Sequence, residues 1–159
     1  MKKVVLFAGL IALASASAIA QSPINFNAKG LVVISDADLS ASALVDGKLL
    51  RDNTAKDQLT TIKFPIERGS KGMGTALVSN SVLGYSKTLA VPSTGGLAYV
   101  LENRLRPDDG VADFKDAVAE FPVGEKLYVV DIANMAGPKA KFGFPVGKKP
   151  TSIDINKNF

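Results

Sequence analysis

The chain has 159 residues, of which 47% are hydrophobic, and it carries 19 basic and 15 acidic side chains but no cysteine and no histidine. This composition fits a globular domain, and it excludes disulfides, Ser-His-Asp and Cys-His nucleophiles, and the usual zinc and copper sites. Any catalysis by this chain would depend on carboxylates, lysine, tyrosine or a hard cation such as calcium. No cofactor follows from the sequence.

Residues 1–20 have the three parts of a secretory signal peptide. A basic start, Met1–Lys3, precedes the apolar run Val4–Leu13, and Ala18–Ala20 forms a small-x-small cleavage site before Gln21. The apolar run is shorter than the ~20 residues that a membrane-spanning helix needs. We therefore expect an exported protein, periplasmic or extracellular, with no stable membrane insertion after the signal peptide is removed.

The mature chain is only mildly basic. Removing Lys2 and Lys3 leaves 17 basic side chains against 15 acidic ones, a net charge of +2. The basic residues are scattered along the sequence, with no dense run and no interleaved aromatic side chains. Nucleic acid is therefore not an expected partner.

Residues 21–159 have the length of one domain, and their pattern is mostly that of β-strands. The apolar run Leu31–Ser35 predicts a buried strand. Asp46-Gly47 predicts a two-residue hairpin turn between short runs at 43–45 and 48–50.

The next segments alternate between apolar and polar side chains, as half-buried strands do. Gln58–Ile66 is one such strand, the glycine-rich Glu67–Gly74 is a loop, and Thr75–Ser79 and Ser86–Val91 are further strands. Pro92–Gly96 predicts a tight turn, because proline fixes φ and glycine supplies positive φ.

The second half repeats a strand signature around an insertion. Leu97–Asn103 and Leu127–Asn134 are both rich in aromatic and β-branched side chains. Between them, Arg104–Glu120 is predicted to be an inserted loop with one short helix, since apolar residues recur there at helical spacing. Lys139–Val146 and Thr151–Ile155 are predicted to follow as strands, the first of them after a Gly-Pro turn.

These strands resemble the YVTN-type β-propeller repeat family. Leu97–Asn103 resembles its first strand, of the Leu-Tyr-Val-x-Asn kind, and Leu127–Asn134 resembles its second. Lys139–Gly147 resembles the closing strand, which ends in Pro-Val-Gly. The resemblance covers residues 75–159, about half of the chain. The chain departs from the repeat in its long insertion and in a Pro-Ser-Thr-Gly-Gly turn where Pro-Asp-Gly is typical.

The resemblance implies an all-β fold of antiparallel β-propeller-like blades. The mature chain has material for about two blades, whereas a closed ring needs at least ~4. We therefore expect residues 21–159 to form a partial propeller, the N-terminal portion of a longer protein. The alternative fold is a self-contained β-sandwich, whose strands also alternate with turns.

A propeller scaffold implies no particular activity, because propellers host many unrelated functions. We predict an exported binding or interaction module for a protein or small-molecule ligand that the sequence does not identify, and we favour this role over an enzymatic one. One alternative is a lactonase-like propeller hydrolase with its catalytic residues largely outside this chain. Another is a structural surface β-sandwich.

Strand parity predicts where the loops gather. In an up-and-down blade, the connections Arg104–Lys126, Glu67–Gly74 and Lys148–Pro150 would share one rim, with Pro92–Gly96 at the other. Long loops on a rigid scaffold often carry binding residues. The candidate ligand-binding residues are therefore Glu102, Asn103, Arg104, Arg68 and Lys71.

A weaker candidate, for a metal, lies after the first predicted strand. Asp36 and Asp38 place alternate carboxylates that one calcium ion can share, although the longer ligand series of a calcium loop is missing. A surface turn is the alternative interpretation of this segment.

Overall fold

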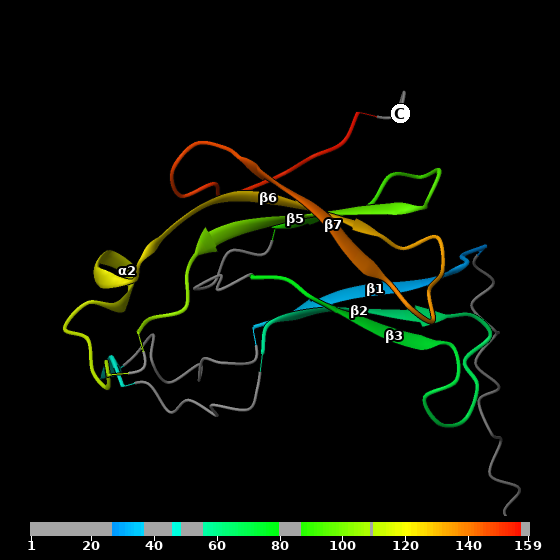
Figure 1. Cartoon of the computed structure of the whole chain (residues 1–159), viewed down its shortest axis with the longest axis horizontal. Coiled ribbons are helices and arrows are strands. Elements are labelled where there is room, and N and C mark those ends of the chain that lie inside the picture. Colours follow the sequence, from blue (N-terminus) through cyan, green and yellow to red (C-terminus); the bar gives the residue numbers. More distant parts are fainter. Residues whose placement is uncertain (1–26, 37–45, 49–55, 80–86, 109, 157–159) are drawn as a thin grey trace, which may run out of the picture.

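The computed structural model describes residues 27–36, 46–48, 56–79, 87–108 and 110–156. These residues form two antiparallel sheets and one single-turn helix (Figure 1). The all-β, antiparallel fold predicted from the sequence is therefore confirmed. The described residues close neither a barrel nor a propeller ring. Among them, no helix has the length and apolar character needed to cross a membrane.

The first sheet contains three strands in chain order. β1 (Gly30–Ser35) pairs with β2 (Gln58–Lys63), and β2 pairs with β3 (Met73–Leu77). The strands predicted at 31–35 and 58–66 are present, although the second ends earlier than predicted. β3 is bonded to β2 and not to any strand of the second sheet, so the two sheets are separate meanders.

The second sheet contains four strands, again in chain order. They are β4 (Leu89–Ala90), β5 (Leu97–Arg104), β6 (Val123–Asp131) and β7 (Lys139–Pro145). Tyr99 lies opposite Val129, and Val100 lies opposite Tyr128. The two tyrosine-valine segments are thus hydrogen-bonded neighbours in one sheet.

Turn residues explain the connection between β4 and β5. The amide of Gly95 donates to the carbonyl oxygen of Pro92 over 2.9 Å. Gly95 and Gly96 have φ values of +72° and +84°, which glycine adopts without a steric penalty. The tight turn predicted at 92–96 is confirmed.

The predicted hairpin turn at Asp46-Gly47 is only partly described. Gly47 has a φ of +70°, as such a turn requires, but the arms at 43–45 and 49–50 lie outside the described residues. The carbonyl oxygen of Gly47 accepts from the amide of Phe114 over 2.7 Å. This turn is therefore attached to the connection between β5 and β6.

The β5–β6 connection contains the predicted short helix, α2 (Ala117–Glu120). Asp116 caps its start, because the Asp116 Oδ1 accepts from the amide of Ala119 over 3.0 Å. The rings of Phe114 and Phe121 pack with centroids 4.7 Å apart and close the connection on itself. The apolar residues at helical spacing begin before Ala117, where the helix starts. The helix does not extend back to Phe114, because the amide of Phe114 bonds to Gly47, outside this connection.

The last predicted strand, Thr151–Ile155, does not form a regular strand. Ser152 makes a single parallel bridge with Lys87, and the amide of Ile153 donates to the Lys87 carbonyl oxygen over 2.9 Å. The segment therefore runs beside the β4 edge of the second sheet and in the same direction as β4.

The two sheets pack face to face, with the core between them (Figure 1). Strand alternation turns every second side chain inward. The buried apolar residues of the two inner faces are Leu59, Ala76, Val78, Ala98, Val100, Val130 and Ile132. Leu59, Val100 and Val130 expose none of their surface, and each such side chain stabilises the fold by roughly 1.5–3 kcal/mol.

Candidate ligand-binding site

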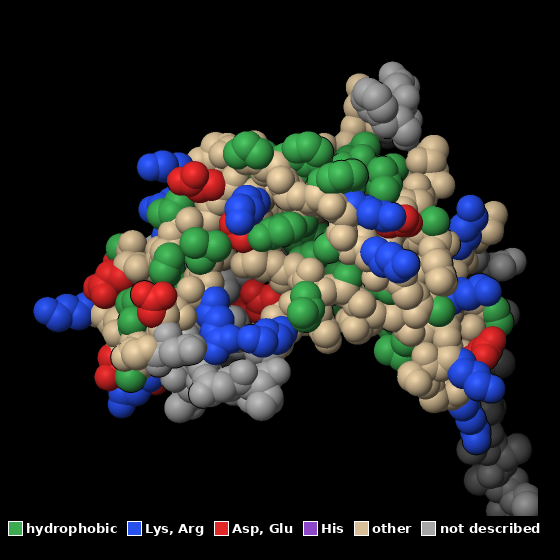
Figure 2. Space-filling view, viewed as in Figure 1, with side chains coloured by type: hydrophobic (Ala, Val, Ile, Leu, Met, Phe, Trp, Pro, Cys, Tyr) green, Lys and Arg blue, Asp and Glu red, His purple; other side chains and the backbone are tan. Residues whose placement is uncertain are grey.

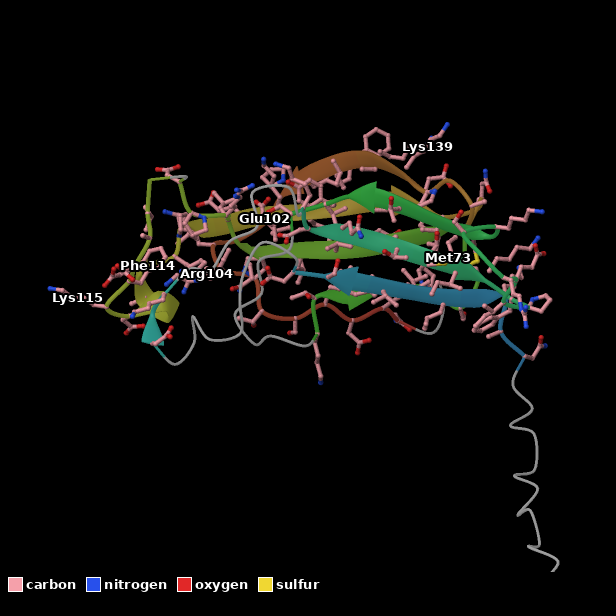
Figure 3. All side chains as sticks on the ribbon, turned by 90° about the horizontal axis from the view of Figure 1, so that it is seen from below. Met73, Glu102, Arg104, Phe114, Lys115 and Lys139 are labelled. Carbon is pink, nitrogen blue, oxygen red and sulfur yellow. The ribbon has the colours of Figure 1, made fainter. Side chains whose placement is uncertain are left out.

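Three consecutive polar residues at the end of β5 are buried. Glu102, Asn103 and Arg104 expose 2%, 1% and 3% of their surface. They lie where the connection to α2 leaves the sheet, and Figure 3 shows Glu102 and Arg104 on the side of the molecule that also carries Phe114. The structure thus brings three of the predicted site residues together, but inside the protein and not on an open rim.

The backbone of β6 is irregular opposite these three residues. The register between β5 and β6 shifts between Glu102 and Arg104. At this point Gly124 and Glu125 face the single residue Asn103, which makes a β-bulge. A Cβ on Gly124 would lie only 2.3 Å from the Glu102 carbonyl oxygen. Glycine is therefore required here for the two strands to approach each other.

Glu102 and Tyr128 form a hydrogen-bonded pair on the inner face of the second sheet. The Tyr128 hydroxyl donates to the Glu102 Oε2 over 2.8 Å. Burial raises the pKa of Tyr128 to about 12, and the hydrogen bond to Glu102 and the negative charge of that carboxylate act in the same direction. The phenol therefore stays protonated and remains a donor at neutral pH.

Asn103 and Arg104 hold the neighbouring chain segments in place. The Asn103 Nδ2 donates to the carbonyl oxygen of Pro150 over 2.7 Å, which anchors the segment after β7. An Arg104 Nη1–H donates to the carbonyl oxygen of Phe121 over 2.9 Å, which anchors the end of the α2 connection. Asn103 Oδ1 is buried and has no hydrogen-bond partner among the described residues. Through these two hydrogen bonds, the side chains of Asn103 and Arg104 hold neighbouring backbone segments against β5.

A pocket of about 260 Å³ opens beside this polar cluster. Its lining residues come from both sheets and from segments that are far apart in the sequence. They are Lys56, Asp57, Leu77, Val78, Ser79, Arg106 and Tyr128. The size suits a small molecule of the dimensions of one sugar ring. Charged side chains of both signs are among these residues. Figure 2 shows that basic and acidic side chains also lie close together elsewhere on the surface that it draws.

The pocket combines an apolar wall with a few polar groups. Among the lining residues, Asp57 and Val78 are buried, with 8% and 4% of their surface exposed, whereas Lys56 is exposed. Tyr128 contributes its ring and its hydroxyl oxygen, which can still accept a hydrogen bond while its proton is donated to Glu102. This arrangement can recognise a small polar ligand.

Arg68 and Lys71, the other two predicted site residues, lie elsewhere. Both are exposed in the connection between β2 and β3. Thr61 of β2 donates through its hydroxyl to the Met135 carbonyl oxygen in the β6–β7 connection. The β6–β7 connection follows Asp131, at the opposite end of β6 from Val123. The β2–β3 connection, with Arg68 and Lys71, therefore lies at that opposite end as well. Figure 3 accordingly shows Met73, which follows Lys71, on the side away from Glu102 and Arg104.

The predicted rim was therefore wrong in one of its three loops. Residues 67–74 connect two neighbouring strands of the first sheet, and they lie at the same end as the turn at 92–96. Residues 148–150 do lie with the α2 connection, because the amide of Lys149 donates to the Gly124 carbonyl oxygen over 3.0 Å. The prediction failed because it treated 67–74 as a link between sheets.

The candidate metal site gains no support from the described residues. Asp36 is half-buried, and Asp38 lies outside the described residues. Within the described part of the chain, no group of three or more acidic side chains is placed to hold a metal ion.

No protein-family model, no curated protein and no solved structure matches this chain.

Sequence reasoning missed the residues that line the pocket. Lys56 and Asp57 precede β2, Ser79 follows β3, and Arg106 follows β5. They meet because the strands pair, and no local motif indicates them. Tyr128 carried one usable signal, since strand alternation puts it on the same face as the core residue Val130.

Proposed function

We propose that this protein is an exported binding module made of propeller-type blades, and that it takes a small polar ligand in the pocket beside Tyr128. The observation that carries the proposal is the gathering of Lys56, Asp57, Ser79 and the Tyr128 hydroxyl around one pocket at the end of the two sheets. Ammonium, carboxylate and hydroxyl groups are suited to hydrogen-bond a polyhydroxylated acid.

The order of the strands supports blades. Each sheet is an antiparallel meander whose neighbours follow one another in the chain, and the second has the four strands of a blade. A Greek-key sandwich instead has a strand that returns by a long connection. The last strands of the two sheets, β3 and β7, contact each other.

The outer face of the second sheet gives independent support. Phe142 and Phe144 of β7 expose 62% and 50% of their surface on the face away from the core. Antiparallel sheets with one solvated face usually present polar side chains there. A blade is covered on both faces by its neighbours, so apolar outer residues are expected of it.

A structural β-sandwich is the second candidate. It is favoured by the fact that the described residues form two sheets around one core. Such a protein would keep its fold without any ligand and would bind no small molecule in the pocket, so the binding experiment separates it from the first proposal.

The binding experiment is an NMR titration of the mature protein with glucuronate, a polyhydroxylated acid, and with glucose as the uncharged comparison. We expect glucuronate to shift the amide signals of Ser79 and Tyr128 at lower concentration than glucose does. Lys56→Ala should weaken glucuronate binding roughly tenfold, the effect of losing one charge-assisted hydrogen bond.

Lys115→Ala is the matched control, because Lys115 is an exposed lysine outside the pocket (Figure 3). It should leave glucuronate binding unchanged. If neither sugar shifts any pocket signal, the binding proposal is wrong. The appearance of a new glucuronate-derived species during the titration would instead support the enzymatic alternative.

Export is tested by expressing the full chain in a bacterial host and sequencing the secreted product. A mature N-terminus at Gln21, in the periplasm or the medium, is the expected result. Uncleaved protein that stays with the cytoplasm would contradict the signal-peptide assignment.

A further inference from the structure

β7 and the segment that follows it form an exposed ribbon with a distinct composition. All seven residues of β7 are exposed. Residues 132–153 contain four lysines and no acidic side chain, and two phenylalanines lie between the two pairs of lysines. The spread of charge over the whole chain conceals this local combination of basic and aromatic residues. The members of this basic-aromatic ribbon are Lys139, Lys141, Phe142, Phe144, Lys148 and Lys149.

The two phenylalanines face outward from the second sheet. Phe142 lies opposite Val129, and Phe144 lies opposite Leu127. Both partners alternate along β6 with core-facing positions such as Val130, so they lie on the face away from the core. The two phenylalanines expose 62% and 50% of their surface, and their ring centroids are 6.0 Å apart. They therefore present one aromatic surface to the surroundings.

Two lysines of the ribbon lie on the same face as the rings. Lys139 lies opposite Asp131, which alternates with the core-facing residues of β6 in the same way. The ammonium group of Lys141 is 3.4 Å from the Asp131 carboxylate. Figure 3 shows Lys139 pointing outward from β7, and Figure 2 shows hydrophobic and basic side chains side by side over β6 and β7.

The other two lysines lie near the opposite end of the ribbon, because the chain after β7 folds back onto the sheet. The amide of Lys149 donates to the carbonyl oxygen of Gly124 over 3.0 Å. The next residue, Pro150, is held by the Asn103 side chain over 2.7 Å. The side chain of Lys148 is 81% exposed. Lysines thus flank the aromatic surface at both ends.

The charge of the ribbon indicates what it can bind. Its four ammonium groups are contacted by only two carboxylates, those of Asp131 and Glu125, which leaves a net charge of +2. The contact between the two sheets inside the protein is instead built from aliphatic side chains. Another apolar protein face would bury ammonium groups without compensation, which is unfavourable.

The surface of an anionic phospholipid bilayer fits both parts of the ribbon. Exposed aromatic rings can enter the boundary between headgroups and acyl chains, and this apolar contact adds to the electrostatic attraction of anionic lipids. Lysine side chains can lay their methylene groups along the apolar boundary while the ammonium groups stay at the level of the phosphates.

We propose that the basic-aromatic ribbon binds reversibly to the surface of bilayers that contain anionic phospholipids. The contact is peripheral, with the two rings at the headgroup boundary. β7 is an edge strand of its sheet, so a neighbouring blade over the middle of the second sheet can leave the ribbon accessible. This inference goes beyond the proposed function, because other residues line the pocket.

The test is co-sedimentation of the mature chain with lipid vesicles. One set of vesicles contains equal parts of phosphatidylglycerol and phosphatidylcholine, and the other contains phosphatidylcholine alone. The mature chain is required because the signal peptide is itself expected to enter membranes. We expect at least about tenfold tighter binding to the anionic vesicles, and most of this preference should disappear at high salt, because salt screens the attraction.

Two double variants separate the two contributions. Lys139→Gln combined with Lys148→Gln should weaken binding to anionic vesicles roughly twentyfold, because each lysine near an anionic surface contributes about fivefold. Phe142→Thr combined with Phe144→Thr removes both rings but keeps residues that favour a strand, and it should weaken binding at least about tenfold.

Lys115→Gln and Ile66→Thr are the matched controls, since both residues are exposed outside the ribbon, and each should bind as the wild type does. Circular dichroism checks that every variant folds; if the phenylalanine variant does not, the lysine variant and the salt dependence decide.

Three results would overturn the inference. They are a mature chain that does not bind the anionic vesicles at low salt, equal binding to both kinds of vesicle, and a folded phenylalanine variant that binds as the wild type does. The last result would point to a soluble anionic polymer as the partner, and dextran sulfate would then compete with the vesicles. Titration with glucuronate examines the pocket separately, so either proposal can fail alone.

Discussion

Replacing Tyr128 with phenylalanine removes the donor of the buried Tyr128–Glu102 hydrogen bond. Glu102 is 2% exposed and accepts from the Tyr128 hydroxyl over 2.8 Å. The variant leaves a buried carboxylate without this donor, and an unsatisfied buried polar group typically reduces stability by about 1–3 kcal/mol. We expect Tyr128→Phe to lower the free energy of unfolding by that amount at pH 7, measured by urea denaturation.

The pair also predicts a pH dependence. Tyr128 has a pKa of about 12 in the folded protein, against 10.0 for the free side chain. The folded pKa is raised, so the contribution of the pair is fully present below pH 10 and is lost as the pH rises toward 12. A two-unit shift corresponds to roughly 2.7 kcal/mol, but the ring is partly exposed and solvent screening reduces this, so we expect about 1 kcal/mol.

The assay compares urea denaturation of wild type and Tyr128→Phe between pH 8 and the highest pH at which the fold persists. The stability gap between the two proteins should narrow above pH 10, because only the wild type loses the protonated phenol. Tyr99→Phe is the control, since Tyr99 lies on the other face of the same sheet. Parallel curves for wild type and Tyr128→Phe across this range would refute the role assigned to the pair.

Two further variants test the backbone of the site and the edge of the second sheet. Gly124→Ala should reduce stability by about 2–3 kcal/mol, because its Cβ would meet the β5 backbone, whereas Gly147→Ala, with open space around it, should change little; thermal melts compare them. Lys141→Ala should raise the pKa of Asp131 only partly in an NMR titration. The amide of Ala133 is the larger cause of the lowered Asp131 pKa and is retained, while the 3.4 Å contact with Lys141 is lost.

Local patterns were sufficient to predict most strands of this fold, although the predicted strand Thr151–Ile155 makes only a single bridge. The apolar run at 31–35 and the alternation from Gln58 gave β1 and β2 because the side-chain period of a strand is visible in any short window. The turn at 92–96 followed from its proline and glycines. The resemblance made Leu97–Asn103 and Leu127–Asn134 the first and second strands of one repeat, and these two segments do pair in the structure.

Short stretches of sequence could not predict which of the two sheets each strand joins. Residues 67–74 contain glycines that suit either a hairpin or a longer link, and only pairing decides between them. In the structure the amide of Lys63 donates to the Gly72 carbonyl oxygen over 2.8 Å, which closes a hairpin and returns β3 to the first sheet. This one assignment moved Arg68 and Lys71 to the opposite end of the molecule.

The predicted site residues at the end of β5 are buried, and the pocket is lined by other residues. A run such as Glu102-Asn103-Arg104 at a strand end suggests binding when the strand end is assumed to be exposed. Here these side chains are buried, and their polar groups are used inside the protein, on Tyr128 and on backbone carbonyls.

This internal use gives the pocket its shape. Glu102 holds Tyr128, which is one wall of the pocket, and Asn103 fixes Pro150 and with it the start of the segment that runs beside β4. A ligand in the pocket would therefore contact a side chain, Tyr128, whose position depends on the buried Glu102 carboxylate.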